Sequence, residues 1–189
     1  MYLPSNIGYL YWILISLGTT ILTVLIITLL LVLFFSVTKP TNKIKHKVMY
    51  YICSFILLVL GIDIKYVNKN KLPKNITYVV YGNHKSMCDA LIVYKLCNTT
   101  MSAAGKSTLS KVFFLPIIMK AFGVMLINRS SDRETAKSMI EGINNVKNGL
   151  SMMIFPEGGI KTLDTQEMID VKPGAYKLAT KALVPIVPI

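Results

Sequence analysis

Residues 76–96 read ITYVVYGNHKSMCDALIVYKL, and this stretch decides the fold class. Its first part, Ile76 to Tyr81, is a short and largely apolar run that ends at a glycine, which is typical of a buried strand. Its last part, Ser86 to Leu96, has the apolar content of a helix, and Ser86 is a favourable N-cap residue. The stretch therefore predicts a strand, a short polar loop and a helix, in that order.

The same alternation continues to the end of the chain. Four more short apolar runs bounded by Gly, Pro, Asn or Lys predict strands at Met101 to Ala104, Val124 to Ile127, Ser151 to Phe155 and Val184 to Val187. Helical stretches lie between them at Leu109 to Phe122, Ser131 to Val146 and Gly174 to Ala182. This order predicts an α/β fold with a mostly parallel sheet flanked by helices, and ligands of such sheets bind beyond the carboxyl ends of the strands.

The first third of the chain is apolar enough to contact a membrane. Residues 1–38 carry no charged side chain, and the apolar run at about 9–37 is longer than the roughly 20 residues that cross a bilayer core. A basic loop at 39–47 and a shorter apolar run at about 48–64 follow. Because lysines flank the short run on both sides, both flanks are expected on the cytoplasmic face, with the run re-entrant or interfacial.

We therefore expect an N-terminal membrane-embedded helical hairpin within residues 1–71, followed by the α/β domain within residues 72–189. Two alternatives stay open. The long run competes with a secretory signal peptide, although it lacks a basic start and a small-residue cleavage site. The short run competes with a buried core helix of the domain.

Charge and cysteine content limit the classes of partner. Lys and Arg number 21 against 9 acidic residues, so the formal net charge of +12 favours a phosphate-bearing ligand, an acidic lipid headgroup or nucleic acid. The three cysteines, Cys53, Cys88 and Cys97, have neither the spacing of a zinc site nor that of a disulfide framework. No metal site is expected.

His84 and Asp89 are the strongest candidates for proton transfer. His84 follows the first strand of the domain, and Asp89 lies five positions later, where the next helix begins. An imidazole takes a proton best when a carboxylate holds its other ring nitrogen, so the two residues form a candidate general-base pair. The alternative is structural, because Ser86 to Asp89 before an apolar run is also a capping box.

Four blocks in order resemble the 1-acylglycerol-3-phosphate acyltransferases, within the glycerolipid acyltransferase superfamily. They are Asn83 to Asp89 (N-H-x-S-x-x-D), Gly123 to Arg129, Phe155 to Gly158, and Val184 to Pro188. The resemblance covers about residues 72–189, and the ordered set is far more specific than any one block.

The resemblance implies an acyltransferase of phospholipid biosynthesis at the cell membrane, with its catalytic domain on the cytoplasmic face. His84 is the implied general base for the free hydroxyl of a lysophosphatidate-like acceptor, and Asp89 orients it. The acyl donor is acyl-CoA or acyl carrier protein, which is a substrate, so no cofactor is expected. Arg129 and Lys106 are expected to bind the acceptor's phosphate, while Glu157 and Gly158 shape the same pocket. The alternatives are a surface ion pair of Arg129 with Asp132 or Glu134, and a plain turn at 156–159.

The chain departs from the family pattern at two places. The third block commonly continues as E-G-T-R, whereas this sequence has Gly159 and Ile160 there, with Lys161 as a partial substitute. This difference leaves the identity of the acceptor open. The chain also stops at Ile189, directly after the fourth block, so the domain is expected to lack its C-terminal part.

Three other interpretations compete with an active acyltransferase. Residues 100–107, TMSAAGKS, nearly match the nucleotide-binding P-loop, with a threonine in place of the first glycine. A basic module for membrane surfaces or nucleic acid would explain the charge but not the ordered blocks. A catalytically dead, lipid-binding relative is the third.

Overall fold

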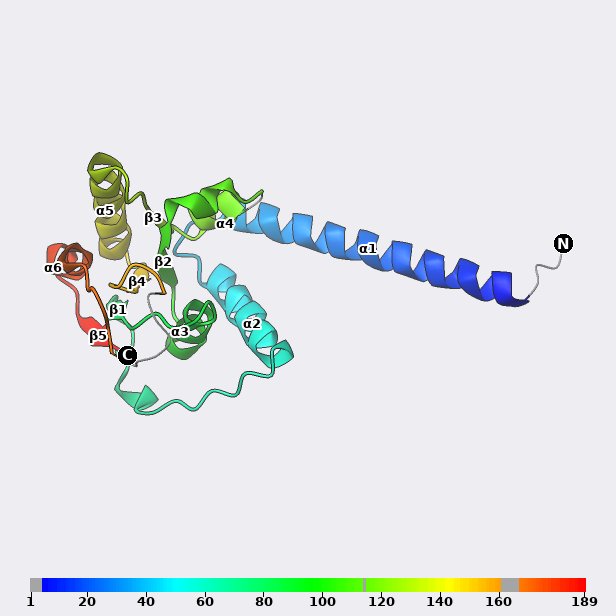
Figure 1. Ribbon diagram of the computed structural model, residues 1–189, viewed down its shortest axis with the longest axis horizontal. Coiled ribbons are helices and arrows are strands. Elements are labelled where there is room, and N and C mark those ends of the chain that lie inside the picture. Colours follow the sequence, from blue (N-terminus) through cyan, green and yellow to red (C-terminus); the bar gives the residue numbers. More distant parts are fainter. Residues whose placement is uncertain (1–4, 114, 161–166) are drawn as a thin grey trace.

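A five-stranded parallel sheet forms the centre of the computed structural model, which describes residues 5–113, 115–160 and 167–189 (Figure 1). The strands are β1 (Val79–Tyr81), β2 (Met101–Lys106), β3 (Met125–Ile127), β4 (Ser151–Ile154) and β5 (Ile186–Pro188). They are arranged in the order β3-β2-β4-β1-β5, and each neighbouring pair is parallel. The α/β fold expected from the sequence is confirmed.

Helices cover both faces of the sheet. The longer ones in the domain are α3 (Asp89–Cys97), α4 (Leu115–Ala121), α5 (Asp132–Lys147) and α6 (Lys177–Ala182), with short 3-10 turns at Lys69–Lys71, Ser107–Lys111 and Pro173–Tyr176. Side chains alternate along a strand. In β1, Val79 and Tyr81 therefore pack in one core cluster with α5 and α6, whereas Val80 packs in a second cluster with α3.

Most elements begin and end close to the expected positions. The helix expected at 174–182 begins as the 3-10 turn Pro173–Tyr176 and continues as α6, and two other differences follow. The helix expected at 109–122 divides into a 3-10 turn and α4, whose second residue is Pro116; proline suits a first helical turn because its missing N–H needs no partner there. The N-cap of α3 is Cys88 rather than Ser86. The Ser86 hydroxyl instead accepts a hydrogen bond from the Cys88 N–H at 3.1 Å, which holds the loop before the helix.

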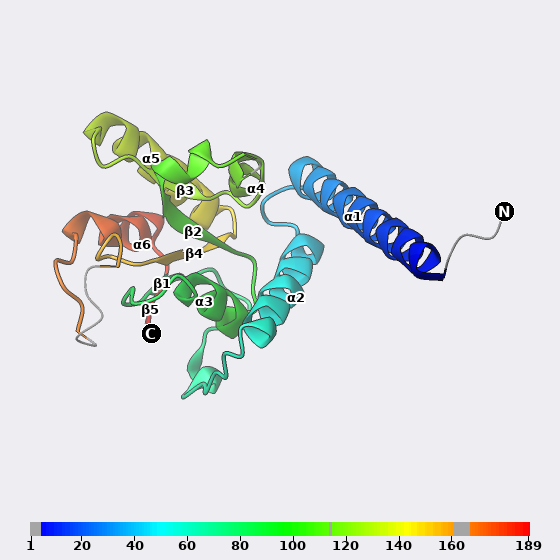
Figure 2. The same cartoon turned by 45° about the vertical axis from the view of Figure 1, so that its right-hand side comes forward.

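Helix α1 (Ser5–Val37) is 33 residues long and projects away from the domain (Figures 1 and 2). Its stretch Gly8–Val37 is long and apolar enough to cross a membrane by length and composition, and only 6% of its most apolar window is buried. At its C-terminal end it packs against α4, where the rings of Phe35 and Phe122 lie 5.1 Å apart. The apolar span expected at about 9–37 thus forms one continuous helix.

Helix α2 (Lys43–Val59) packs against α3 and has two unlike faces. Cys53 and Leu57 are buried, and Cys53 belongs to the core cluster that also contains Val80 and residues of α3. Phe55 and Leu58 are exposed on the other face. The second apolar helix therefore combines a packed face with an apolar surface open to its surroundings.

The basic loop expected at 39–47 contains two residues that are not solvated charges. Lys45 is fully buried, and its Nζ donates to the carbonyl of Thr38 at 2.8 Å and to that of Ala121 at 2.7 Å. Burial lowers the pKa of Lys45. His46 is 4% exposed. Through its two hydrogen bonds, Lys45 ties the ends of α1 and α4 together.

Candidate active site

The candidate base His84 lies in the loop that follows β1. Its Nδ1 is 3.0 Å from Oδ2 of Asp89, and both side chains are about one-fifth exposed, at 19% and 20%. The imidazole also stacks on the ring of Phe155, with 4.3 Å between centroids and 11° between planes. A carboxylate on one side and an aromatic face on the other hold the ring in a single orientation.

Asp89 accepts two further hydrogen bonds from the backbone. The N–H groups of Lys85 and Ser86 donate to Oδ2 at 2.7 and 2.8 Å. Asp89 therefore organises the start of α3 and holds His84 with the same carboxylate. The pairing with His84 and the capping of α3 were considered as alternatives for Asp89, and the structure contains the contacts of both.

The second ring nitrogen of His84 is available for chemistry. When Nδ1–H donates to a carboxylate, the neutral tautomer leaves a lone pair on Nε2. Within the described part of the chain, no side chain or backbone group hydrogen-bonds Nε2. His84 can therefore take a proton from a bound hydroxyl group.

Glu157 connects the loops that follow β4 and β1. Its side chain is fully buried, and Oε1 accepts from the backbone N–H of His84 at 3.3 Å. Its Oε2 is 3.9 Å from Nζ of Lys85, which is within ion-pair reach but too long for a hydrogen bond. Glu157 thus holds the main chain at the candidate base, and its expected part in the acceptor pocket stays a prediction.

Lys85 is a site residue that the sequence reasoning missed. Besides facing Glu157, its Nζ donates to the backbone carbonyl of Glu167 at 2.9 Å, so it links the loop of His84 to the segment after β4. Its position beside His84 was the only available signal. Lys161, considered as a substitute for the family's arginine, lies outside the described residues.

Arg129 lies against the glycines of the β4 loop. A Cβ added to Gly158 would come within 3.1 Å of Nη2 of Arg129, and one added to Gly159 within 3.7 Å. Both glycines have positive φ, at 74° and 154°, so the loop has a conformation that favours glycine. At position 159 the family commonly has threonine. The positive φ of Gly159 would strain a β-branched residue, so the glycine fits this backbone.

The structure does not contain the surface ion pair considered for Arg129. Asp132 and Glu134 are both described, and neither forms an ion pair with its guanidinium. Glu134 instead accepts from the Asn128 side chain at 2.7 Å. The exposed guanidinium of Arg129 is therefore free of a carboxylate among the described residues, beside the loop that holds Glu157.

Lys106 is the last residue of β2 and is exposed. It stands opposite Ile127 in the register with β3, which places it at the same sheet edge as Arg129. The P-loop interpretation of residues 100–107 is wrong, because Met101 to Lys106 form a strand instead of a loop that wraps phosphates.

A cavity of about 160 Å³ adjoins the candidate base pair. Its lining residues come from the ends of β1 and β4, from α3 and from the last residue, and include Gly82, Asp89, Val93, Phe155 and Ile189. Among the described residues, no group of three or more His, Cys, Asp or Glu side chains could hold a metal ion. The carboxyl edge of the sheet thus holds an imidazole in contact with a carboxylate, and Arg129 and Lys106 lie at the same edge.

Comparisons with known proteins identify the family of the chain. A family model described as Acyltransferase matches residues 63–189. The 1-acyl-sn-glycerol-3-phosphate acyltransferase of Saccharomyces cerevisiae is 32% identical over 133 residues, which are 70% of this chain and 44% of that protein. A probable enzyme of the same name from Mycoplasma pneumoniae is 31% identical over 151 residues, or 78% of this chain and 56% of that one. The chain thus spans about half the length of these relatives.

One solved structure resembles the fold. It is the crystal structure of the 1-acyl-sn-glycerophosphate (LPA) acyltransferase PlsC from Thermotoga maritima, with a TM-score of 0.66 at 21% identity. The match covers 82% of this chain and 62% of that one. At this identity the likeness supports the fold alone.

Proposed function

Because the chain belongs to the acyltransferase family, we propose that it moves a fatty acyl group to the free hydroxyl of a lysophosphatidate-like acceptor. The donor is acyl-CoA or acyl carrier protein. The observation that carries this proposal is the pair of His84 and Asp89, 3.0 Å apart, with Nε2 of His84 open. The names of the two relatives above support the choice of acceptor.

His84 acts as the general base in this reaction. Its Nε2 takes the proton of the acceptor hydroxyl while that oxygen bonds to the thioester carbonyl carbon. The carbon–sulfur bond then breaks, and the imidazolium returns the proton to the leaving sulfur. A thiol has a pKa of about 8.5, so the thiolate leaves readily and no covalent enzyme intermediate is required. Asp89 stabilises the imidazolium while its charge exists.

Two cations at the sheet edge bind the phosphate of the acceptor. Arg129 is exposed and offers a planar fork of donors, which suits a phosphate, and Lys106 adds a second positive charge. Glu157 and Gly158 keep the neighbouring loop in the conformation against which Arg129 lies.

Helix α1 anchors the protein in the membrane, where its acceptor resides. Its apolar surface is exposed over nearly its whole length. Lys39, Lys43 and Lys47 follow within ten residues of Val37, and such a basic flank favours the cytoplasmic face. The sheet domain follows this flank and works on that face.

The test is an acyl transfer assay with the full chain in detergent. Labelled acyl-CoA or acyl carrier protein is mixed with lysophosphatidate, and the diacyl product is compared between wild type, His84→Ala and the surface control Lys137→Ala. We expect product from wild type and control, and almost none from His84→Ala. Equal product from all three would contradict the base assignment. Folded wild type that binds lysophosphatidate but transfers nothing from either donor would identify a catalytically dead relative.

A further inference from the structure

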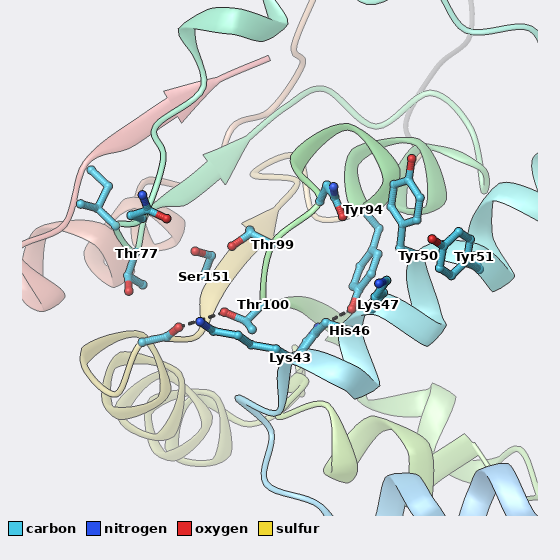
Figure 3. Close-up of a pocket in the computed structure, with 14 residues that line it drawn as sticks. Lys43, His46, Lys47, Tyr50, Tyr51, Thr77, Tyr94, Thr99, Thr100 and Ser151 are labelled. Atoms are coloured by element: carbon cyan, nitrogen blue, oxygen red, sulfur yellow. Dashed lines mark hydrogen bonds between the residues drawn. The ribbon is translucent and has the colours of Figure 1, made fainter.

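A second and larger cavity lies at the opposite edge of the sheet from His84. Its volume is about 650 Å³, and it is formed by residues that precede or begin β1, β2 and β4, together with one face of α2 (Figure 3). We call it the amino-edge pocket, and its main polar residues are Lys43, Lys47, Thr77, Thr99, Thr100 and Ser151. Thr77 lies before β1 and His84 lies after it, seven residues further along the chain, so the two sites lie at opposite ends of this strand and are separated by roughly 20 Å.

The amino-edge pocket is positively charged. Lys43 and Lys47 are one helical turn apart on α2, so they share a face, and the lining contains no acidic residue. Figure 3 shows the Lys43 side chain extending toward Thr100. Throughout the described ranges, no carboxylate forms an ion pair with either lysine. The two charges are available to an anionic ligand.

The neutral groups of the pocket suit a phosphate. The hydroxyl groups of Thr77 and Thr99 line it, and neither takes part in a hydrogen bond within the described part of the chain. The hydroxyl of Thr100 donates to the carbonyl of Gly149 at 3.2 Å. This hydrogen bond satisfies a carbonyl oxygen that would otherwise repel an anion. The Thr77 and Thr99 hydroxyl groups are therefore open to donate to an anion held by the lysines.

One wall of the pocket is rigid and uncharged. His46 contacts the Tyr94 hydroxyl through Nδ1 and the Pro40 carbonyl through Nε2, so both ring nitrogens are used. Burial lowers its pKa, with a smaller contribution in the same direction from Lys45. His46 fixes the first turns of α2 and hence the base of both lysine side chains.

The position of the pocket near the end of α1 indicates that its phosphate ligand belongs to a membrane lipid. Lys43 lies six residues after Val37, the last residue of the apolar helix α1, so the lysines lie close to the end of the candidate membrane span. Basic residues at such a position attract anionic lipid headgroups. We propose that the amino-edge pocket binds the phosphate-bearing headgroup of an anionic membrane lipid, with Lys43 and Lys47 as its counter-charges.

This site is separate from the acceptor site at the carboxyl edge and does not depend on acyl transfer. It takes a diacyl lipid of the surrounding membrane as a ligand and leaves it unchanged. Occupancy would place an anionic headgroup beside Lys43 and Lys47, near the end of helix α1.

The test counts lipids retained on the full chain by native mass spectrometry in a mild detergent. The probes are didecanoyl phosphatidylglycerol and didecanoyl phosphatidylcholine, and neither is a lysolipid acceptor. We expect wild type to retain phosphatidylglycerol preferentially. The double variant Lys43→Gln/Lys47→Gln should weaken this binding about tenfold or more, since each lysine near a membrane contributes substantially to anionic lipid affinity.

Two further variants separate the pocket from general charge. Lys137→Gln/Lys181→Gln removes the same net charge from exposed positions on α5 and α6, and we expect it to retain lipid like wild type. Thr99→Trp fills the pocket without changing charge, and we expect it to lose binding. Equal losses in both double variants, or no loss with Thr99→Trp, would overturn the proposal. Lipid-free binding of inorganic phosphate with the same dependence on Lys43 and Lys47, without preference for phosphatidylglycerol, would overturn the lipid assignment.

Discussion

His84 and His46 are the two histidines of the chain, and the structure gives them opposite surroundings. His84 is partly exposed, with Nδ1 held by Asp89 and Nε2 open. His46 is a buried residue of α2, with Nδ1 at the hydroxyl of Tyr94 on α3 and Nε2 at the carbonyl of Pro40 in the loop after α1. An imidazole can transfer protons when one nitrogen is held and the other is free. When both are satisfied inside the protein, it holds elements together.

We expect the largest effect on the rate of acyl transfer when His84, whose Nε2 is open, is replaced. His84→Ala should lower kcat by about 10²- to 10⁴-fold, the usual contribution of a general base, while the thermal midpoint changes little. Initial rates and thermal unfolding of the full chain in detergent measure the two quantities. A variant that loses its fold, yet retains a normal rate per folded molecule, would place His84 with His46 as a structural residue.

The next change tests which role of Asp89 dominates. Asp89→Asn keeps an oxygen that can accept from the backbone of Lys85 and Ser86, but it removes the charge that stabilises the imidazolium. We expect kcat to fall roughly tenfold to a hundredfold, with little change in KM for the acyl donor. Steady-state kinetics provide the measurement. An unchanged kcat would mean that Asp89 serves only to start α3.

The third change addresses the buried histidine. His46→Gln should lower the free energy of unfolding by roughly 1 to 3 kcal/mol, because the Tyr94 hydroxyl and the Pro40 carbonyl lose well-placed partners in a buried site. The kcat of the folded fraction should remain that of wild type. Urea unfolding followed by circular dichroism measures the loss. A fall in kcat as large as that of His84→Ala would remove the distinction between the two histidines.

The smallest effect concerns pH. Burial lowers the pKa of His46 below its ordinary value of 6.5, so the unfolded chain binds a proton more readily than the native protein. The stability contributed by neutral His46 is complete above about pH 6.5 and decreases as the pH falls through the window below it, by at most about 1.4 kcal/mol per pH unit. Urea midpoints between pH 7 and 5 should therefore fall more steeply for wild type than for His46→Gln. Parallel curves would contradict this assignment.

The strand and helix pattern was predictable because each element is a short local signal. All five strands were placed from apolar runs next to Gly, Pro, Asn or Lys, and the site at the carboxyl edge followed from parallel topology. The strand order β3-β2-β4-β1-β5 was not predicted, because it depends on packing between segments far apart in sequence. The capping box was interpreted as an alternative to a pairing with His84, yet the same Asp89 carboxylate contacts His84 and accepts from the backbone before α3.

Other features depended on contacts that the sequence does not display. The near-match to a P-loop was misleading because Gly105 and Lys106 lie in the extended backbone of β2. Lys45 reads as a surface charge among its lysine neighbours, yet its partners are backbone carbonyls at 38 and 121. The amino-edge pocket is assembled from residues between 43 and 151, so no motif marks it.

The burial of Lys45, His46 and Cys53 matters for anyone who wishes to shorten the chain. A soluble fragment that starts at residue 72 would follow the change in composition, but it would expose the surface of α3 that α2 covers and leave Tyr94 without His46. A fragment that starts near residue 38 would keep both carbonyl acceptors of Lys45 and remove the apolar helix α1. The practical boundary for expression therefore lies between α1 and α2.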